Sequence, residues 1–452
     1  MSVLTWTSEA AALESIPLSE RLRRLRASHH AMWNYVTYRD AIALLGLDPA
    51  AIYPKGSTRL DPAEWADLGW LTCFCGPPAS AVDAMRAAAT AESLNQYTPD
   101  LIEPLRDAAA AAFGRSRDGG FEVVGTEGTQ AAVALALMAT VDPGDEVIVS
   151  DPGYFHIPSA VLAAGGVPVA VTIGPDTGYR LDPADVARAI TTRTRAICIV
   201  DPLNPYGTVQ TREELVALAE LADRHGLLLV HDVTHAPIGL DPDAAFASLP
   251  ALELTDRAVA AMSVSHCYGM AGARIGFLGG PPGFVRGCLQ LKAALTRLNT
   301  NLISQHGALA ALNDESYLAG AARTVAGNLA HLQRTLESAP GVRLVVRPER
   351  GLACAIDVSG TGASAQELMV ALFACRVAVY PGDGLGDTGA ASTIRINLSR
   401  PDPWAMVHLR SVLADAVDEA ASGRWREPVV SLLERKGTDR AARLARQIGG
   451  PG

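Results

Sequence analysis

The chain has 452 residues, and 49% of them are hydrophobic although only 5% are aromatic. This length and apolar content suffice for two or three domains, or for one large and one small domain that share a site. The formal net charge of −10 argues against nucleic acid as a partner, because a protein that binds nucleic acid needs a basic surface to meet the phosphates.

The seven cysteines are scattered along the chain, and Cys73-Phe74-Cys75 lacks a second pair at the spacing of a zinc site. We therefore expect reduced thiols, no metal site and a cytoplasmic location. Residues 1–7 lack a basic region followed by an apolar run, which argues against a signal peptide. The longest apolar run, residues 131–141, is too short to cross a bilayer, so we predict no membrane association.

Residues 1–85 form a predicted N-terminal segment, with a helical pattern over residues 18–38 and then a turn-rich stretch. Over residues 86–320, apolar β-rich runs alternate with helical patterns such as residues 130–138 and 212–224. The runs lie at residues 121–124, 146–149, 196–200, 227–230 and 258–264. This alternation predicts a large α/β domain in which helices cover both faces of a mostly parallel sheet.

Residues 321–422 are expected to form a smaller α+β C-terminal domain that begins with a long helix over residues 321–337. Its predicted strands are residues 342–346, 353–358, 377–380 and 393–397. The tail, residues 423–452, is basic and has a helical pattern, and we expect it to be peripheral.

The segment Gly125-Thr126-Glu127-Gly128-Thr129-Gln130 lies between the predicted strand 121–124 and the predicted helix 130–138. A Gly-Thr pair at a helix N-terminus offers unpaired N–H groups, a hydroxyl and the positive end of the helix dipole, which together suit a phosphate. Taken alone, the pattern is equally typical of an ordinary strand-to-helix turn.

Tyr154, Asn204 and Asp232 each follow or end one of the predicted strands. The carboxyl ends of the strands are where open α/β sheets place their ligands, so these side chains are candidates for a binding site. Each also has an ordinary structural explanation, respectively a tyrosine in a turn, an Asn-Pro turn and an aspartate that caps the next turn.

Residues 263–277, SVSHCYGMAGARIGF, carry the most specific pattern in the chain. The pattern resembles the loop around the cofactor lysine in class I/II aminotransferases, the fold-type I enzymes that use pyridoxal 5′-phosphate (PLP). In that family the fourth position is the lysine to which PLP is covalently attached, whereas here it is His266. An imidazole cannot form that bond. The six motifs occur in the family's order, and the resemblance covers residues 75–400.

The resemblance implies an α/β fold with a seven-stranded-type, mostly parallel sheet in the large domain, and it implies a role for each motif. The implied phosphate ligands are Gly128, Thr129, Ser263, Ser265 and Arg274. Tyr154 would stack on the pyridine ring, Asn204 would donate to the phenolic oxygen, and Asp232 would pair with the ring nitrogen.

Two more residues match functional positions of the family. Arg395, in the predicted strand 393–397, resembles the arginine that binds the substrate's α-carboxylate through paired N–H groups. Tyr97 resembles the tyrosine that reaches the neighbouring subunit's phosphate, which implies a homodimer with shared sites. His235 stands where the family has a tyrosine, and it could donate a hydrogen bond or titrate.

The three lysines, Lys55, Lys292 and Lys436, all lie outside the predicted strand ends, so PLP or pyridoxamine 5′-phosphate would be held without a covalent bond. His266 then becomes the candidate general base, with His235 as a second catalytic group, because an ordinary histidine is available in its neutral form at neutral pH. The substrate would be an amino acid or a keto acid.

Three interpretations stay open. The first is an elimination or dehydration, for which the related GDP-4-keto-6-deoxymannose 3-dehydratase is a precedent, since it also has histidine for lysine and uses pyridoxamine phosphate. The second is an atypical aminotransferase with His266 as the proton carrier. The third is a non-catalytic protein that binds PLP or another metabolite, or that serves as a partner subunit.

Overall fold

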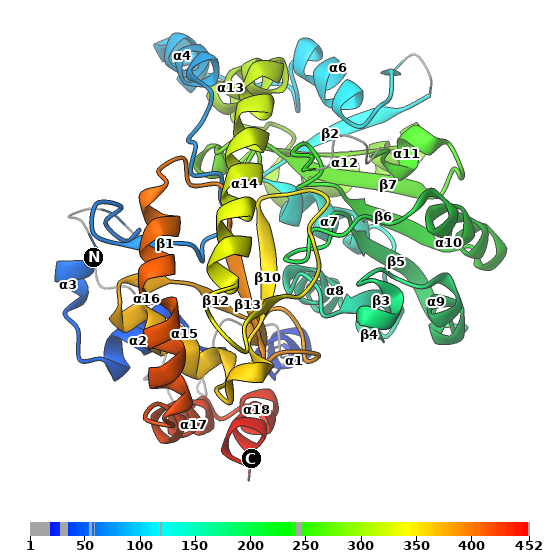
Figure 1. The fold of residues 1–452 in the computed structure, drawn as a ribbon. Helices are drawn as coiled ribbons and strands as arrows, with labels where there is room; N and C mark the ends of the chain where they lie inside the picture. Colours follow the sequence, from blue (N-terminus) through cyan, green and yellow to red (C-terminus); the bar gives the residue numbers. More distant parts are fainter. Residues whose placement is uncertain are drawn as a thin grey trace.

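The computed structural model describes residues 19–27, 35–53, 57, 59–117, 120–240 and 246–450. Its centre is a seven-stranded sheet with the strand order β2-β8-β7-β6-β5-β3-β4 (Figure 1). These strands are β2 (Glu122–Thr126), β3 (Glu146–Asp151), β4 (Val167–Thr172), β5 (Thr194–Val200), β6 (Leu228–Asp232), β7 (Ala258–Ser263) and β8 (Gly276–Gly280). Only β8 pairs antiparallel to its neighbours, so the predicted α/β fold with a mostly parallel sheet is confirmed.

Two strands of this sheet were not predicted. Strand β4, VPVAVT, is apolar but contains Pro168, a residue that is disfavoured inside strands and tolerated at a sheet edge such as this one. Strand β8 contains Gly276, Gly279 and Gly280, and glycine is depleted in strands. Strand β8 is therefore specified by its antiparallel pairing with β2 and β7 rather than by its own composition.

Helices cover both faces of the large sheet, as the sequence predicts. Val147 and Val149 of β3 belong to one buried cluster with residues of α7 (Thr129–Met138) and α8 (His156–Ala164). Ile148, between them, belongs to another cluster with residues of α10 (Arg212–His225). Because successive side chains of a strand point to opposite faces, this alternation shows that both faces of the sheet are buried.

A second, four-stranded sheet has the order β12-β13-β10-β9. Its strands are β9 (Arg343–Leu344), β10 (Ala353–Asp357), β12 (Tyr380–Pro381) and β13 (Thr393–Asn397), and a separate parallel pair joins β1 (Ala66–Asp67) to β11 (Val377–Ala378). The strand predicted at residues 377–380 is therefore split in two. The reason is that its first half pairs with the N-terminal β1 and its second half with β13.

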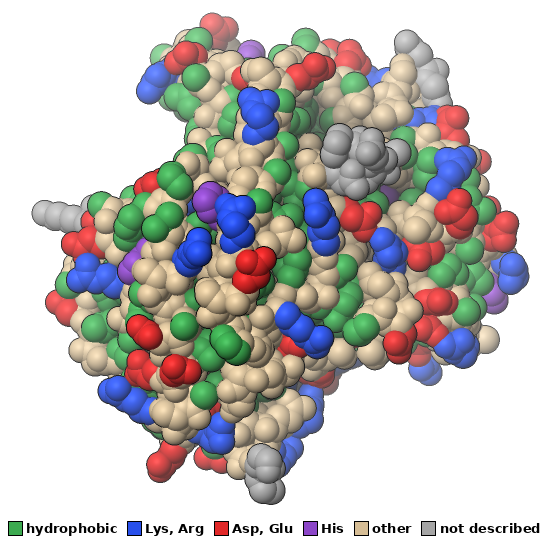
Figure 2. Space-filling view, in the orientation of Figure 1, with side chains coloured by type: hydrophobic (Ala, Val, Ile, Leu, Met, Phe, Trp, Pro, Cys, Tyr) green, Lys and Arg blue, Asp and Glu red, His purple; other side chains and the backbone are tan. Residues whose placement is uncertain are grey.

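The other helices are α1 (Glu20–Ala27), α2 (Tyr38–Leu44), α3 (Pro49–Ile52), α4 (Ala79–Ala88), α5 (Ala91–Asn95), α6 (Glu103–Ala112), α9 (Pro183–Ala189), α11 (Leu249–Leu252), α12 (Pro282–Thr296), α13 (Leu302–Leu312), α14 (Glu315–Leu336), α15 (Ala365–Ala374), α16 (Trp404–Ala421), α17 (Arg426–Arg435) and α18 (Asp439–Gly449). None of the described helices is long and apolar enough to cross a membrane. On the face in Figure 2, acidic and basic side chains are interspersed.

Two predictions for the chain ends were wrong. The helix predicted over residues 18–38 is not continuous, because Thr37 is extended and caps α2 by accepting a hydrogen bond from the Asp40 backbone N–H; residues 18 and 28–34 lie outside the described ones. The tail is not peripheral either. Val429 of α17 and Leu444 of α18 are buried in the same apolar cluster as α15 and α16.

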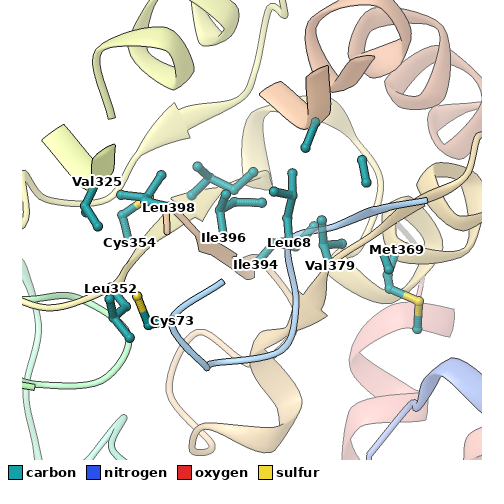
Figure 3. Packing of buried hydrophobic residues seen from close by; sticks show 14 of the residues in the cluster. Leu68, Cys73, Val325, Leu352, Cys354, Met369, Val379, Ile394, Ile396 and Leu398 are labelled. Atoms are coloured by element: carbon teal, nitrogen blue, oxygen red, sulfur yellow. The ribbon is translucent and has the colours of Figure 1, made fainter. Parts of the chain in front are cut away.

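An N-terminal segment, residues 68–73, crosses the second sheet before the chain enters the large sheet. Leu68 and Cys73 pack among Leu352, Ile394 and Ile396, side chains of β13 and of the loop before β10 (Figure 3). The Leu68 carbonyl oxygen also accepts a hydrogen bond from the Asn397 backbone N–H at 2.6 Å. This packing fixes the position of the next carbonyl groups, which face the candidate site.

Candidate active site

The predicted site residues of the large sheet gather at one edge of that sheet. Strands β2, β3, β5, β6 and β7 all run in one direction, so their carboxyl ends meet there. Past these ends lie Gly128, Tyr154, Asn204, Asp232 and the segment Ser263–His266. This is the edge at which open α/β sheets bind ligands.

A cradle for an anion lies at the start of α7. Gly128 is its N-cap residue, with φ +103°, a conformation that L side chains rarely adopt. A Cβ atom on Gly128 would lie 3.0 Å from Nη2 of Arg274, whose guanidinium donates to the Glu127 carbonyl. The N-terminal N–H groups of α7, buried Thr129 and a guanidinium thus surround one place, which suits a dianionic phosphate.

Ser263 and Ser265 lie beside this cradle at the end of β7. The backbone N–H of Ser265 donates to Oγ of Ser263 at 3.3 Å. Oγ of Ser265 is buried and has no hydrogen-bond partner among the described residues. A buried hydroxyl without a partner carries a desolvation cost, which a ligand oxygen would remove.

Asp232 ends β6 and is buried, with 5% of its surface exposed. Its Oδ1 accepts the Thr234 backbone N–H at 3.0 Å, and Oγ1 of Thr234 donates to Oγ1 of Thr129 at 2.6 Å. Burial raises the pKa of Asp232 above its ordinary value, although the hydrogen bonds from Thr234 oppose that rise. A cation bound beside the carboxylate would compensate for the burial.

The geometry of His266 fixes which of its nitrogens can act as a base. Nδ1 lies 2.5 Å from the Leu71 carbonyl oxygen, which can only accept, so Nδ1 carries the hydrogen and Nε2 has a free lone pair. Burial lowers the pKa of His266 to about 4, since it outweighs the hydrogen bond to Leu71, which acts in the opposite direction. At neutral pH the ring is therefore uncharged, and Nε2 is the nitrogen that carries the lone pair.

Two more histidines lie close to His266. The ring centroid of His235 is 4.9 Å from that of His266, and Nδ1 of His235 is buried without a partner among the described residues. Burial lowers the pKa of His235 well below its ordinary value, and the nearby His266 lowers it further. His156, which the sequence analysis did not single out, packs edge-on to Tyr154, and burial lowers its pKa to about 4.

Arg395 of β13 brings a positive charge from the second sheet to this edge. It is buried, with 4% exposed, and donates from Nη2 to the Gly69 carbonyl oxygen at 2.7 Å and from Nη1 to Oδ1 of Asn204 at 3.5 Å. Its Nε has no described partner, and the guanidinium lies 4.3 Å from the ring centroid of Tyr380. A buried guanidinium that contacts carbonyls and a ring, but no described carboxylate, suits an incoming anion.

Tyr154 and Tyr97 differ in their surroundings. Tyr154 is half-buried beside His156, and burial followed by the charge of Asp232 raises the pKa of its hydroxyl, which stays neutral. Tyr97 is 75% exposed, and Arg297 lies over its ring at 4.3 Å. No described contact joins Tyr97 to the sheet edge within this subunit.

The two described lysines are both engaged elsewhere. Nζ of Lys292 is buried and donates to Oδ1 of Asp100 at 2.5 Å and to Thr300 at 2.9 Å. Nζ of Lys436 donates to Oδ2 of Asp40 at 3.0 Å. Lys55 lies outside the described residues.

The carbonyl groups of Gly69 and Leu71, which contact Arg395 and His266, were not predicted from the sequence. Every residue has such a carbonyl, so no sequence pattern marks these two. His156, by contrast, could have been found, because it lies two residues beyond Tyr154 at the end of a predicted strand.

Comparisons with known proteins agree on one family. A family model described as aminotransferase class I and II matches residues 72–411. A curated aspartate aminotransferase from Streptomyces avermitilis is 34% identical over 241 residues, which cover 52% of this chain but only 58% of that protein. An aspartate/prephenate aminotransferase from Thermus thermophilus is 31% identical over 304 residues, 65% of this chain and 77% of that protein.

Among solved structures, a double mutant of the Thermus thermophilus aspartate aminotransferase superposes with a TM-score of 0.75 and 26% identity. This match covers 88% of the present chain and 99% of that one. The range that the family model matches, residues 72–411, contains all the strands of both sheets.

The lowered pKa of His266 predicts how stability depends on pH. Between a pH of about 6.5 and about 4, His266 binds a proton in the unfolded chain but stays unprotonated in the folded protein. His266 therefore lowers the stability of the folded state as the pH falls through this range. The variant His266→Asn lacks this proton uptake. Its melting temperature relative to the wild type should therefore rise as the pH is lowered from about 7 to about 4.5.

The measurement is thermal unfolding of both proteins, followed by circular dichroism at several pH values in this range. Because carboxylates titrate equally in both, the difference between the two melting temperatures isolates His266. A difference that stays constant with pH would contradict the buried, neutral imidazole.

Proposed function

This chain belongs to the class I and II aminotransferase family, whose members depend on PLP, and we propose that it is an enzyme of this family in which His266 takes over the proton transfer of the missing lysine. The proposed substrate is an α-amino acid or the corresponding keto acid. The observation that carries the proposal is the hydrogen bond from Nδ1 of His266 to Leu71, since it leaves an uncharged Nε2 at the sheet edge.

Unsatisfied polar groups at the sheet edge support PLP or pyridoxamine phosphate as the ligand. Oγ of Ser265 and Nδ2 of Asn204 are buried without partners among the described residues, and Asp232 is a buried carboxylate. These groups fit a phosphate, a phenolic oxygen and a cationic ring nitrogen, respectively. When bound, the cofactor supplies an electron sink for the bonds at the substrate's α-carbon.

The remaining groups would hold the cofactor in place. Gly128, Thr129, Ser263 and Arg274 would bind the phosphate together with Ser265, and Tyr154 would cover the ring face. With Lys292 and Lys436 both paired to carboxylates, we propose that the cofactor is held without a covalent bond.

The chain's own groups suffice to move a proton at the substrate. Arg395 would bind the substrate carboxylate through its guanidinium, in exchange for the carbonyl of Gly69. Nε2 of His266 would accept the α-proton and return it. His235, 4.9 Å away between ring centroids, would accept or donate a hydrogen bond at the same place. Both transamination and elimination begin with this proton transfer.

A second copy of the chain is the proposed partner. Four exposed side chains, Leu94, Tyr97, Leu295 and Leu298, come from two segments that the contact between Arg297 and Tyr97 joins. Exposed apolar residues gathered in this way are typical of an interface. We propose that Tyr97 reaches the phosphate site of the neighbouring subunit.

Cofactor attachment is tested by mass. We expect the wild type to bind PLP with a change in the visible spectrum and, after borohydride reduction and denaturation, to show the mass of the bare chain. The variant His266→Lys restores an amine at the family position, so after the same treatment it should retain one phosphopyridoxyl group. A phosphopyridoxyl group fixed to a lysine of the wild type would contradict non-covalent binding.

The base is tested by isotope exchange. With PLP bound in heavy water, amino acids should exchange their α-hydrogen, and NMR shows which of a panel do so. His266→Gln should slow this exchange by about 10²–10⁴-fold, the usual contribution of a general base, whereas His235→Gln should slow it less. The visible spectrum of bound PLP serves as the control for cofactor occupancy. Unchanged exchange in His266→Gln would exclude His266 as the base.

The interface is tested by sedimentation. Leu295→Glu places a charge among the exposed apolar residues and should convert a dimer to monomers. The matched control is Val407→Glu, which alters an equally exposed residue of α16 in another part of the molecule and should leave the dimer intact. Tyr97→Phe should keep the dimer and weaken PLP binding several-fold, because it loses one hydroxyl at the phosphate. A wild-type monomer would contradict the shared site.

A further inference from the structure

A loop of the second sheet reaches across to the large sheet beside the candidate site. This bridging loop, residues 382–390, connects β12 to β13, and Tyr380 and Arg395 at its base are paired in the sheet register. The backbone N–H of Gly153 donates to the Leu385 carbonyl oxygen at 2.6 Å. The loop therefore contacts Gly153, the neighbour of Tyr154. The strand that follows the loop contains Arg395, the proposed carboxylate-binding residue.

Asp151 makes three further hydrogen bonds to this loop. Its Oδ1 accepts the Asp387 backbone N–H at 2.7 Å, and its Oδ2 accepts from the backbone N–H and the hydroxyl of Thr388 at 3.2 Å and 2.9 Å. Gly386 allows the close approach, since a Cβ atom there would lie 2.1 Å from Oδ1 of Asp151. The Asp151 carboxylate, at the end of a strand of the large sheet, thus binds the bridging loop of the second sheet.

The C-terminal helix α18 holds the same loop from the other side. Nε of Arg440 donates to Oδ1 of Asp387 at 2.8 Å, and its Nη2 donates to the Gly386 carbonyl oxygen. Arg440 is only 4% exposed, whereas its neighbour Arg443, which reaches Oδ2 of Asp387 at 3.3 Å, has a half-exposed side chain. Helix α18 lies beyond residues 72–411, the part that the family model matches.

Tyr35 and Val36, which precede helix α2, also contact this part of the second sheet. The Val36 backbone N–H donates to Oδ2 of the buried Asp383 at 2.9 Å, and the ring of Tyr35 lies 5.7 Å from that of Tyr380. The bridging loop therefore lies at the meeting point of four parts of the chain: the Asp151–Tyr154 turn, the residues before α2, strand β13 with Arg395, and helix α18.

We propose that Arg440 is a positioning residue of the active site, which acts through Asp387 to hold the bridging loop on Asp151. The proposal rests on the proposed function, because the groups that it positions are the ring-stacking Tyr154 and the carboxylate-binding Arg395. Arg440 itself touches neither substrate nor cofactor. Its side chain fixes the orientation of Asp387, whose backbone N–H is the group that Asp151 binds.

The experiment compares Arg440→Met with the matched control Arg443→Met, which removes the more exposed arginine from the same carboxylate. Hydrogen exchange by mass spectrometry on the cofactor-free protein should show faster exchange in Arg440→Met at residues 150–155 and 382–390, with the large sheet unchanged. PLP binding, measured by its visible spectrum, should weaken by about tenfold in Arg440→Met and change less than about twofold in Arg443→Met. Arg440→Lys should restore part of both effects.

A double-mutant cycle completes the test. If the two contacts act through one loop, Asp151→Asn and Arg440→Met together should weaken PLP binding by less than the product of the separate effects. Independent effects, or faster exchange confined to residues 382–390, would overturn the proposal. So would faster exchange throughout the protein, which indicates a general loss of stability. If the wild type binds no PLP, the proposed function fails, whereas the exchange at residues 150–155 still decides whether Arg440 holds the two loops together.

Discussion

The hydrogen bond from Nδ1 of His266 to the Leu71 carbonyl is the contact on which the candidate site depends. It selects one tautomer, and so it decides that Nε2 rather than Nδ1 can bind a proton. It also ties the end of β7 in the large sheet to the N-terminal segment that packs on the second sheet. This contact therefore sets the chemistry of the imidazole, and it is one of several that join the two sheets, together with those of Asp151 to the loop after β12 and of Arg395 to Asn204.

Two charged residues near this contact are buried in a way that destabilises the folded protein. Arg395 and Asp232 are both buried, and neither is paired with an opposite charge among its described hydrogen-bond partners. Uncompensated burial destabilises the folded protein, and burial accordingly lowers the pKa of Arg395 and raises that of Asp232. A ligand with a carboxylate at one end and a cationic ring nitrogen at the other would remove both penalties. The unfavourable burial of these two charged groups thus matches the proposed substrate and cofactor.

The sequence predicted the parts of this site that depend on strand ends. Asn204, Asp232 and His266 follow apolar runs, and the carboxyl ends of parallel strands must meet, so their proximity follows from the pattern alone. The carbonyls of Gly69 and Leu71 could not be predicted, because their position results from packing between residues distant in the chain. The same holds for the tail. Its apolar residues, such as Val429 and Leu444, have a helical spacing, but nothing in that spacing names the surface that they cover.

A cofactor held without a covalent bond, as proposed above, places different demands on the surrounding protein. A covalently attached cofactor is positioned by its bond, whereas an unattached one must be positioned entirely by contacts, and each contact must be rigid to be effective. Asp151, Asp387 and Arg440 form a continuous series of hydrogen bonds that joins the Asp151–Tyr154 turn to helix α18. With the cofactor held non-covalently, as proposed, such a series would supply the rigidity that a covalent bond otherwise gives. Under the proposed function, the histidine at the family's lysine position and the attachment of α18 to the bridging loop would act together to hold the cofactor.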